Sequence, residues 1–362
     1  MSSDRTRSSH GLAEIRMGKR TTRIRIGQIG ICHEHAAAKM QTLRRLADTF
    51  EIVGVVDDRS TAVARFAGDD LTPYEDLTWM TEEELLNAPG LGAVIIETAN
   101  DDLVPAALRC MRHNVSIHMD KPGGEDMAAF RRLLEGCRKR DLVFQMGYMF
   151  RNNPAMQFAA RAVRDNWLGE LFEFQADMSH NYGSEAYQAY IGRFQGGIMF
   201  NLACHLVDLI VSIMGRPENV VPFLKSAPGY GSAVRNNCLA VLEYPHALAT
   251  LRACSKEIDG VNRRSMKISG TKGTIELSPL ERFDGRPLQM RLVLLQGNSE
   301  YAAGSHVVDF GVTHDRYQDQ LLEFAELVRG KGHNKYTYEH DELVQEVLLA
   351  SCGLLKWKDA TA

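Results

Sequence analysis

The chain has 362 residues, a formal net charge of -4 at pH 7 and 44% hydrophobic residues. This length favours two domains over one, and the mixed charges give no broad basic surface for nucleic acid. No apolar run is long enough to cross a membrane, and the seven cysteines form no Cys-x-x-Cys pair, as is typical of a reduced, cytoplasmic protein. Residues 1–22 are Arg- and Ser-rich without the apolar core of a secretory signal, which predicts a disordered tail.

The first part of the chain alternates short apolar strands with amphipathic helices. Strands are predicted at 23–29, 51–57, 92–98, 115–120 and 142–148, and helices at 36–50, 104–114 and 124–141. Continuous apolar strands separated by helices predict a parallel sheet that is covered on both faces. We therefore expect an α/β domain over residues 23–147.

The pattern changes after about residue 148. Strand-like runs follow one another at 170–178, 237–245, 247–257, 265–278 and 288–296. Helices are predicted at 152–169, with Pro154 in the first turn, and at 200–215, 315–330 and 341–357. Residues 148–362 are therefore expected to form an α+β domain with a mostly antiparallel sheet.

The stretch RIRIGQIGICHEHAAAK, residues 23–39, opens like a dinucleotide-binding loop, which usually runs Gly-x-Gly-x-x-Gly. Counting from Gly30, the second and third glycine positions hold Cys32 and His35. A small Cys32 is tolerated near a phosphate, whereas the His35 side chain has to leave the interface between helix and strand. On its own the loop is a weak signal, and an ordinary strand followed by a turn stays open.

Two acids, Asp57 and Asp58, end the second predicted strand, where a carboxylate accepts from the adenosine ribose hydroxyls. A carboxylate at this place also repels a ribose 2'-phosphate, which favours NAD over NADP. Arg59 follows at once and would favour the phosphate, and an ordinary turn or helix cap is the alternative role for the acids.

Four further motifs follow in order: TAN (98–100), DKP (120–122), NLACH (201–205) and YEHDELVQEVLLASCG (338–353). Together with the loop they resemble the Gfo/Idh/MocA family of sugar and cyclitol dehydrogenases, from about residue 22 onward. Asp120 stands for the family's Glu in DKP, and Asn201 stands for its Asp in NLACH. The resemblance implies a Rossmann domain followed by an open-faced sheet domain, with the substrate held between them.

By this resemblance Lys121 and His205 are the catalytic pair, with Asn201 beside them. Oxidation of a secondary alcohol releases a hydride and a proton, and a histidine is a suitable base for the proton. The ammonium of Lys121 can stabilise an alkoxide-like oxygen. Asn201 and His205 are four residues apart and are expected on one helix face, where Asp208 could orient the imidazole. Without the resemblance, His205 would be a core residue and Lys121 a surface lysine.

The remaining expected contacts come from the same motifs. Cofactor contacts are expected from Gly30, Ile31, Cys32, His33, Asp57, Asp58, Arg59, Thr98, Ala99, Asn100, Asp120 and Lys121. Substrate contacts are expected from Lys121, Arg151, Asn152, Tyr182, Asn201 and His205, although Arg151, Asn152 and Tyr182 would otherwise be ordinary surface. His33 and His35 form a His-x-His pair, but no carboxylate or thiolate cluster with ligand spacing accompanies it. Phosphate or nicotinamide contact is therefore favoured over a metal.

The leading functional hypothesis is an NAD-dependent dehydrogenase of a sugar, sugar acid or cyclitol. A glycosidase-like enzyme that reduces and reoxidises its bound NAD within one turnover is the first alternative. A cofactor-binding sensor is the second, and the presence of both Lys121 and His205 argues against it. The apolar residues of 288–296 are expected on a free sheet face, which predicts a homodimer or homotetramer.

Overall fold

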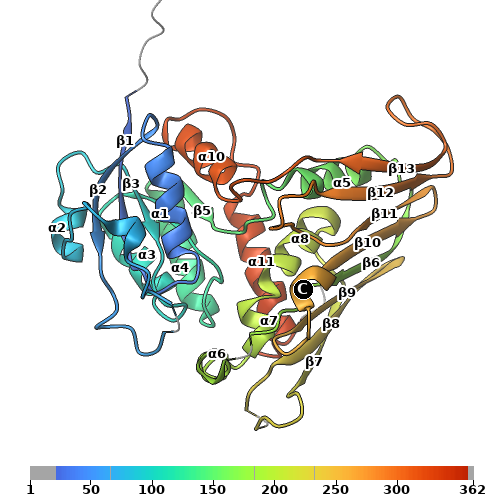
Figure 1. The fold of residues 1–362 in the computed structure, drawn as a ribbon, viewed down its shortest axis with the longest axis horizontal. Helices are drawn as coiled ribbons and strands as arrows, with labels where there is room; N and C mark the ends of the chain where they lie inside the picture. The colour runs from blue at the N-terminus through green and yellow to red at the C-terminus, as the bar shows by residue number, and fades with distance from the viewer. Residues whose placement is uncertain (1–21, 66, 183, 232, 358–362) are drawn as a thin grey trace, which may run out of the picture.

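The computed structural model describes residues 22–65, 67–182, 184–231 and 233–357 (Figure 1). The predicted tail lies outside these residues, apart from Thr22. Two sheets organise the chain, and the first is parallel with five strands. In spatial order these are β2 (Phe50–Val56), β1 (Ile24–Ile29), β3 (Ala93–Ile96), β4 (Ser116–Met119) and β5 (Phe144–Met146).

Helices cover both faces of this sheet, as the alternating pattern predicts. They are α1 (Ala36–Arg45), α2 (Glu82–Leu86), α3 (Leu103–Arg112) and α4 (Met127–Lys139), with a short 3-10 turn at Thr72–Tyr74. Side chains of α3 and α4 pack with Val94 and Ile96 of β3, while α1 packs with Ala93 and Ile95 on the other face. The predicted helix 36–50 ends early, at Arg45, because Phe50 begins β2 and pairs with Ile24.

The second sheet has eight strands and is mostly antiparallel, as predicted. In spatial order they are β13 (Gly304–Asp309), β12 (Gln289–Leu294), β11 (Gly273–Leu277), β10 (Ser265–Gly270), β6 (Leu171–Asp177), β9 (Ala247–Cys254), β8 (Asn237–Tyr244) and β7 (Asn219–Lys225). Only the β6–β9 pair at the centre is parallel. The sequence did not predict the two edge strands, β7 and β13.

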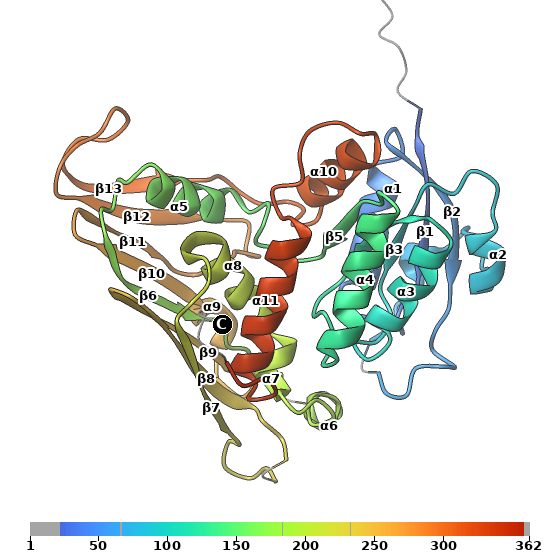
Figure 2. The same cartoon turned by 180° about the vertical axis from the view of Figure 1, so that it is seen from behind.

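Helices lie on one face of this sheet, the face turned toward the first domain (Figures 1 and 2). They are α5 (Pro154–Arg164), α6 (Glu185–Ile191), α7 (Gly197–Asn201), α8 (Cys204–Met214), α9 (Gly260–Arg263) and α11 (Tyr338–Ser351). Pro154 is the first residue of α5, and Asn153 caps that helix by accepting from the backbone N–H of Ala155. In the views drawn, no helix of the described chain lies on the opposite face.

Helix α10 (Gln318–Val328) crosses back to the first domain. Its Leu321 and Phe324 are buried in the same core cluster as Ile26 and Met40. The segment after the second sheet therefore completes the cover of the first, although the sequence pattern groups it with the second domain.

The structure adds two observations, one on the helices and one on the cysteines. None of their helices has both the length and the apolar character needed to cross a bilayer. All seven cysteines are buried and unpaired, as small apolar groups in the core.

Candidate active site

The turn after β1 is tight enough to require a glycine. Gly30 has φ +87°, and a Cβ at this position would stand 2.5 Å from the backbone nitrogen of Thr98. The chain then turns away and begins α1 only at Ala36, after His35. At Gly30 the backbone therefore comes as close to the neighbouring chain as at the first glycine of a nucleotide-binding loop. The loop differs in having histidines just before the start of α1.

Asp58 ties this loop to the ends of the neighbouring strands. Its Oδ1 accepts from the backbone N–H of Ile31 at 2.8 Å and of Cys32 at 3.1 Å. Its Oδ2 accepts from the N–H of Ala99 at 3.3 Å, just after β3. Asp58 is buried, whereas Asp57 is exposed, so the two expected acids have different roles.

A cavity of about 610 Å³ opens at the carboxyl ends of β1, β2 and β3. Asp57 and Asp58 both line it, together with Thr98. Asp57 also holds Arg59, whose Nη2 lies 2.6 Å from its Oδ2. The Thr98 hydroxyl is buried without a hydrogen-bond partner among the described residues, which leaves it available to a ligand.

Lys121 follows β4 and is fully buried at the junction of the two domains. Its Nζ lies 2.7 Å from Glu34 Oε1 and donates to the backbone carbonyl of Asn201 at 3.3 Å. Burial alone would lower the pKa of Lys121, but the Glu34 carboxylate outweighs it and raises the pKa. Burial would likewise raise the pKa of Glu34, yet the Lys121 ammonium lowers it to about 2. Lys121 and Glu34 are therefore a charged pair at neutral pH.

His205 is buried on α8 with its Nδ1 unpartnered in the part of the chain that the structure describes. Aromatic rings surround it, with the centroids of Phe150 at 5.7 Å, Tyr148 at 5.9 Å and His35 at 6.2 Å. Burial, and then the positive charge of Lys121, lower its pKa well below the usual value. The imidazole is therefore neutral at pH 7 and keeps a lone pair.

The helix predicted over 200–215 is broken into α7 and α8, with turns at Leu202 and Ala203. The Asn201 side chain accepts from Asn100 Nδ2 at 2.6 Å and donates to the Tyr187 hydroxyl at 2.8 Å. Asn201 therefore anchors the TAN turn to the second domain. The break removes the regular i, i+4 alignment that the sequence predicts for Asn201 and His205.

A second cavity, of about 360 Å³, lies between the domains. It is lined by Glu34, His35, Met149, Met178, His180, Tyr182, Leu202, His205, Val261, Arg264, Phe283, Arg316 and Tyr317. The Tyr182 ring stacks on His180 with centroids 3.6 Å apart, so Tyr182 stands where a substrate contact was expected. Burial, and then the positive charge of Arg264, lower the pKa of His180 to about 4.

Two arginines on one wall of this cavity share a single carboxylate. Glu281 Oε2 lies 3.1 Å from Arg316 Nη2 and 3.9 Å from Arg264 Nη1. Two guanidinium groups on one carboxylate leave a surplus positive charge at the wall. The sequence did not reveal this pair, because the residues come from three distant segments.

Arg151, Asn152 and Asp208 lie elsewhere than the sequence predicts. Arg151 is buried and paired with Asp208 and Asp341, with Nη2–Oδ1 distances of 2.6 Å to each. Asp208 therefore holds Arg151 and does not orient His205. Asn152 Nδ2 donates to Glu323 at 3.1 Å. Of the six expected substrate contacts, Tyr182 and His205 line the interdomain cavity, whereas Lys121, Arg151, Asn152 and Asn201 do not.

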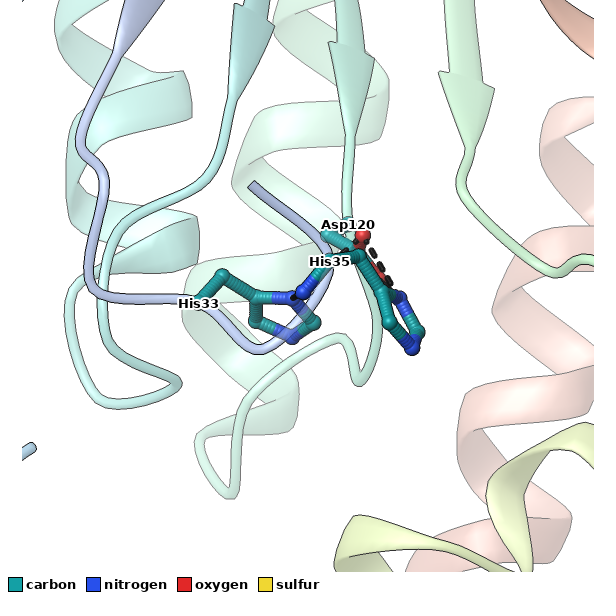
Figure 3. A group of neighbouring side chains, drawn as sticks. All are labelled: His33, His35 and Asp120. Carbon is teal, nitrogen blue, oxygen red and sulfur yellow. Dashed lines mark hydrogen bonds and ion pairs between the residues drawn. The ribbon is translucent and has the colours of Figure 1, made fainter. Parts of the chain in front are cut away.

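A buried polar cluster includes Asp120, which Figure 3 shows beside His33 and His35. Lys39 Nζ is 2.7 Å from Glu97 Oε1 and 2.6 Å from Asp120 Oδ2, and it donates to His118 Nε2 at 3.0 Å. Asp120 is fully buried and also contacts His35, with Oδ2 3.1 Å from Nδ1. Lys39 was missed from the sequence, although its place on the apolar face of α1, four residues after His35, was the available signal.

Comparison with known proteins places the chain in a family. Residues 24–148 match the oxidoreductase family with an NAD-binding Rossmann fold, and residues 156–276 match the GFO/IDH/MocA C-terminal domain. The protein therefore belongs to the Gfo/Idh/MocA oxidoreductases.

Its relatives are distant. Trans-1,2-dihydrobenzene-1,2-diol dehydrogenase of Bos taurus is 25% identical over 199 residues, which are 54% of this chain and 57% of that enzyme. The chain thus spans little more than half the length of this relative. The scyllo-inositol 2-dehydrogenase (NAD(+)) of Bacillus subtilis is 22% identical over 256 residues, 68% of this chain and 70% of that enzyme.

The fold is similar to that of levoglucosan dehydrogenase in complex with NADH and levoglucosan. The TM-score is 0.75 at 14% identity, and the match covers 94% of this chain and 100% of that one. At this identity the likeness concerns the fold.

Proposed function

We propose that the protein oxidises a secondary hydroxyl of a sugar, sugar acid or cyclitol and passes the hydride to NAD. The observation that carries this proposal is a charged Lys121, held by Glu34, that acts electrostatically on a neutral His205, with Glu34 and His205 both lining the interdomain cavity. The names of the bovine and Bacillus relatives, a diol dehydrogenase and an inositol dehydrogenase, favour an alcohol substrate.

The strand ends of the first domain fit the adenosine half of a dinucleotide. Asp58 faces both the loop and the larger cavity, and the Thr98 hydroxyl is free to take a polar group of the ligand. We therefore assign the ribose contact to Asp58, with Asp57 at the rim. When bound, NAD supplies the hydride acceptor.

The protein's own groups handle the proton and the charge. His205, neutral and with a free lone pair, accepts the hydroxyl proton. The Lys121 ammonium, held by Glu34, stabilises negative charge on the reacting oxygen as it develops. The ring walls around His205 exclude water and fix the orientation of the imidazole.

The cationic wall selects among substrates. Arg264 and Arg316 share Glu281, so a substrate carboxylate would complete their pairing. A cavity of about 360 Å³ is at the small end of ligand sites and fits a single sugar ring. Within the proposed substrate class, sugar acids are therefore favoured over neutral polyols.

Calorimetric titration with NAD and NADP tests the cofactor assignment. NAD is expected to bind more tightly than NADP. Asp58→Ser is expected to reduce the difference in binding free energy between the two cofactors by about 1.5–3 kcal/mol, the value of a charge-assisted hydrogen bond. Asp57→Ser is the matched control and is expected to have a smaller effect, because Asp57 is already paired with Arg59. Equal or tighter binding of NADP by the unmodified protein would contradict the preference and assign the dominant role to Arg59.

A further inference from the structure

His33 and His35, the two histidines of the loop, meet a carboxylate at the end of β4 (Figure 3). His33, His35 and Asp120 are buried, and their potential metal-ligating atoms all lie within 4.8 Å of one another. This is the set of donors that the sequence did not reveal, because Asp120 is 85 residues from His35 along the chain.

The donor spacing already suits a single ion. Asp120 Oδ2 lies 3.1 Å from His35 Nδ1 and 3.4 Å from His33 Nδ1. Two donors bound at about 2.1 Å with tetrahedral or octahedral angles are themselves about 3.0–3.4 Å apart. Two of the three donor pairs therefore already have the separation of metal ligands, and all three donor atoms lie within 4.8 Å of one another.

The tautomer of His33 is the one that a metal ligand needs. Its Nε2 lies 3.1 Å from the carbonyl oxygen of Lys121, which can only accept, so Nε2 carries the hydrogen. A metal-binding histidine commonly donates its other ring N–H to a carbonyl in this way. Nδ1 therefore keeps its lone pair, which now accepts from the backbone N–H of His35 at 3.2 Å.

Two carboxyl groups lie close to the same nitrogen. Besides Asp120, Glu97 Oε2 lies 3.6 Å from His33 Nδ1, and this oxygen is buried without a hydrogen-bond partner among the described residues. An arrangement of three electron-rich atoms around one point is stabilised by a cation placed between them.

Two ammonium groups balance the carboxylates of the metal-free cluster. Lys121 pairs with Glu34, while Lys39 lies between Glu97 and Asp120. Burial, and then the charge of Asp120, raise the pKa of the Glu97 carboxyl well above its usual value, so Glu97 holds a proton that a bound cation would displace.

We propose that His33, His35 and Asp120 bind one divalent first-row transition-metal ion, with Glu97 beside it. The ion takes the place of the proton between His35 Nδ1 and Asp120, and Lys39 keeps its hydrogen bond to the carboxylate. His35 lines the interdomain cavity, so the ion is reached from there and can bind an oxygen of the molecule in that cavity. Two histidines and one carboxylate leave open positions for such a ligand.

Metal binding is measured on chelator-treated protein without nucleotide or substrate, so the result is independent of the proposed dehydrogenase activity. Zn²⁺ is titrated by calorimetry, and Co²⁺ is followed by its visible absorption. One equivalent of each is expected to bind. His35→Gln keeps a side chain that can hydrogen-bond Asp120 but is expected to weaken Zn²⁺ binding by about a hundredfold or more, since even loss of a supporting contact costs 10–100-fold.

The control is His113→Gln, an exposed histidine at the end of α3, which is expected to bind Zn²⁺ like the unmodified protein. Should His35→Gln fail to melt cooperatively, Asp120→Asn and His33→Gln report on the same site. No stoichiometric Zn²⁺ binding by the unmodified protein would overturn the proposal and leave Lys39 as the cation that holds Asp120. Unchanged affinity in the folded ligand variants would also overturn it, by showing that the ion binds elsewhere.

Discussion

At the scale of single residues, the site combines groups whose charge states are fixed by burial and by a single partner each. Lys121 stays charged because Glu34 lies 2.7 Å away, and His205 stays neutral because burial disfavours its charged form. The same reasoning extends to the residues that line the cavity.

The paired arginines are expected to set substrate preference. Arg316→Gln removes one of the two cations that share Glu281, so the KM of a carboxylated sugar should rise about tenfold or more, the value of a charge-assisted hydrogen bond. The KM of a neutral polyol should change little. Steady-state kinetics on a matched acid and polyol checks this, with Arg161→Gln as the control because Arg161 pairs with Glu300 far from the cavity. An equal change in KM for both substrates would show that the arginines do not recognise the carboxylate.

His180 is expected to destabilise the fold as the pH falls. Its pKa is lowered to about 4 by burial and by Arg264, whereas the unfolded chain binds a proton near pH 6.5. The unfolded state therefore takes up the proton first, and stability is lost as the pH is lowered from about 6.5 to about 4.

His180→Phe keeps a ring against Tyr182 and removes the titrating group. Between pH 7 and pH 4 the unmodified protein should lose about 1–2 kcal/mol more unfolding free energy than this variant. The difference is small because His180 is only part-buried. Urea unfolding at pH 7 and pH 4 measures it. An identical pH dependence in the variant would show that His180 is solvated in the folded protein.

At the scale of secondary-structure elements, Arg151 joins the start of α5 to two other helices. It pairs with Asp208 on α8 and Asp341 on α11, and all three side chains are buried. Arg151→Met leaves two buried carboxylates without a cation and is expected to cost about 3–5 kcal/mol of unfolding free energy.

Urea denaturation measures this cost. The control is Arg138→Met, which breaks a half-exposed pair with Glu339 and is expected to cost less than about 1 kcal/mol. A similar small cost for both variants would mean that the buried triad does not hold the helices together.

Features that depend on residues close together in the sequence could be predicted, whereas features that depend on contacts between distant residues could not. The five strands of the first sheet follow from apolar runs, and α5 follows from Pro154 in its first turn, since these patterns are contained within a few residues. The break between α7 and α8 could not be predicted, because its residues are as apolar as those of a continuous helix. The role of Arg151 was also hidden, because its partners are 57 and 190 residues away.

The same distinction between local and long-range contacts applies to the candidate active site. The motifs singled out Lys121 and His205; in the structure Lys121 donates across the domain junction to the Asn201 carbonyl, and His205 lines the interdomain cavity. They did not reveal that Glu34 pairs with Lys121, that Asp58 rather than Asp57 holds the loop, or that Lys39 lies under Asp120. Each of these contacts depends on side-chain direction after folding.

At the scale of the whole molecule, the face of the second sheet turned away from the helices is a candidate interface. The expected apolar residues of β12, Met290, Leu292 and Leu294, are in fact buried in the protein's own core, and Gln289 and Arg291 face outward. Exposed apolar side chains lie on other strands of the outer face, at Phe223, Leu248 and Val307. The apolar residues that could form an interface are therefore on β7, β9 and β13, and not on β12 as the sequence indicated.

A homodimer or homotetramer remains the prediction, because large exposed apolar residues on one sheet face favour association. Light scattering at micromolar concentration should give at least twice the 40.5 kDa of one chain. Leu248→Arg should shift the mass toward the single chain, while Ile258→Arg, an exposed position outside the strands, should not. A 40.5 kDa particle for the unmodified protein would contradict the prediction.

The central claim is that Lys121 and His205 carry out an NAD-linked oxidation in the interdomain cavity. The most direct test is the rate of reduced-nicotinamide formation from NAD with a panel of sugars, sugar acids and cyclitols, for the unmodified protein and for Lys121→Ala, His205→Ala and the exposed control His246→Ala. We expect turnover by the unmodified protein and His246→Ala, and a loss of about a hundredfold or more in the other two, which should still melt cooperatively and bind NAD. Undiminished turnover in His205→Ala, or no reduced cofactor from any member of the panel, would contradict the account.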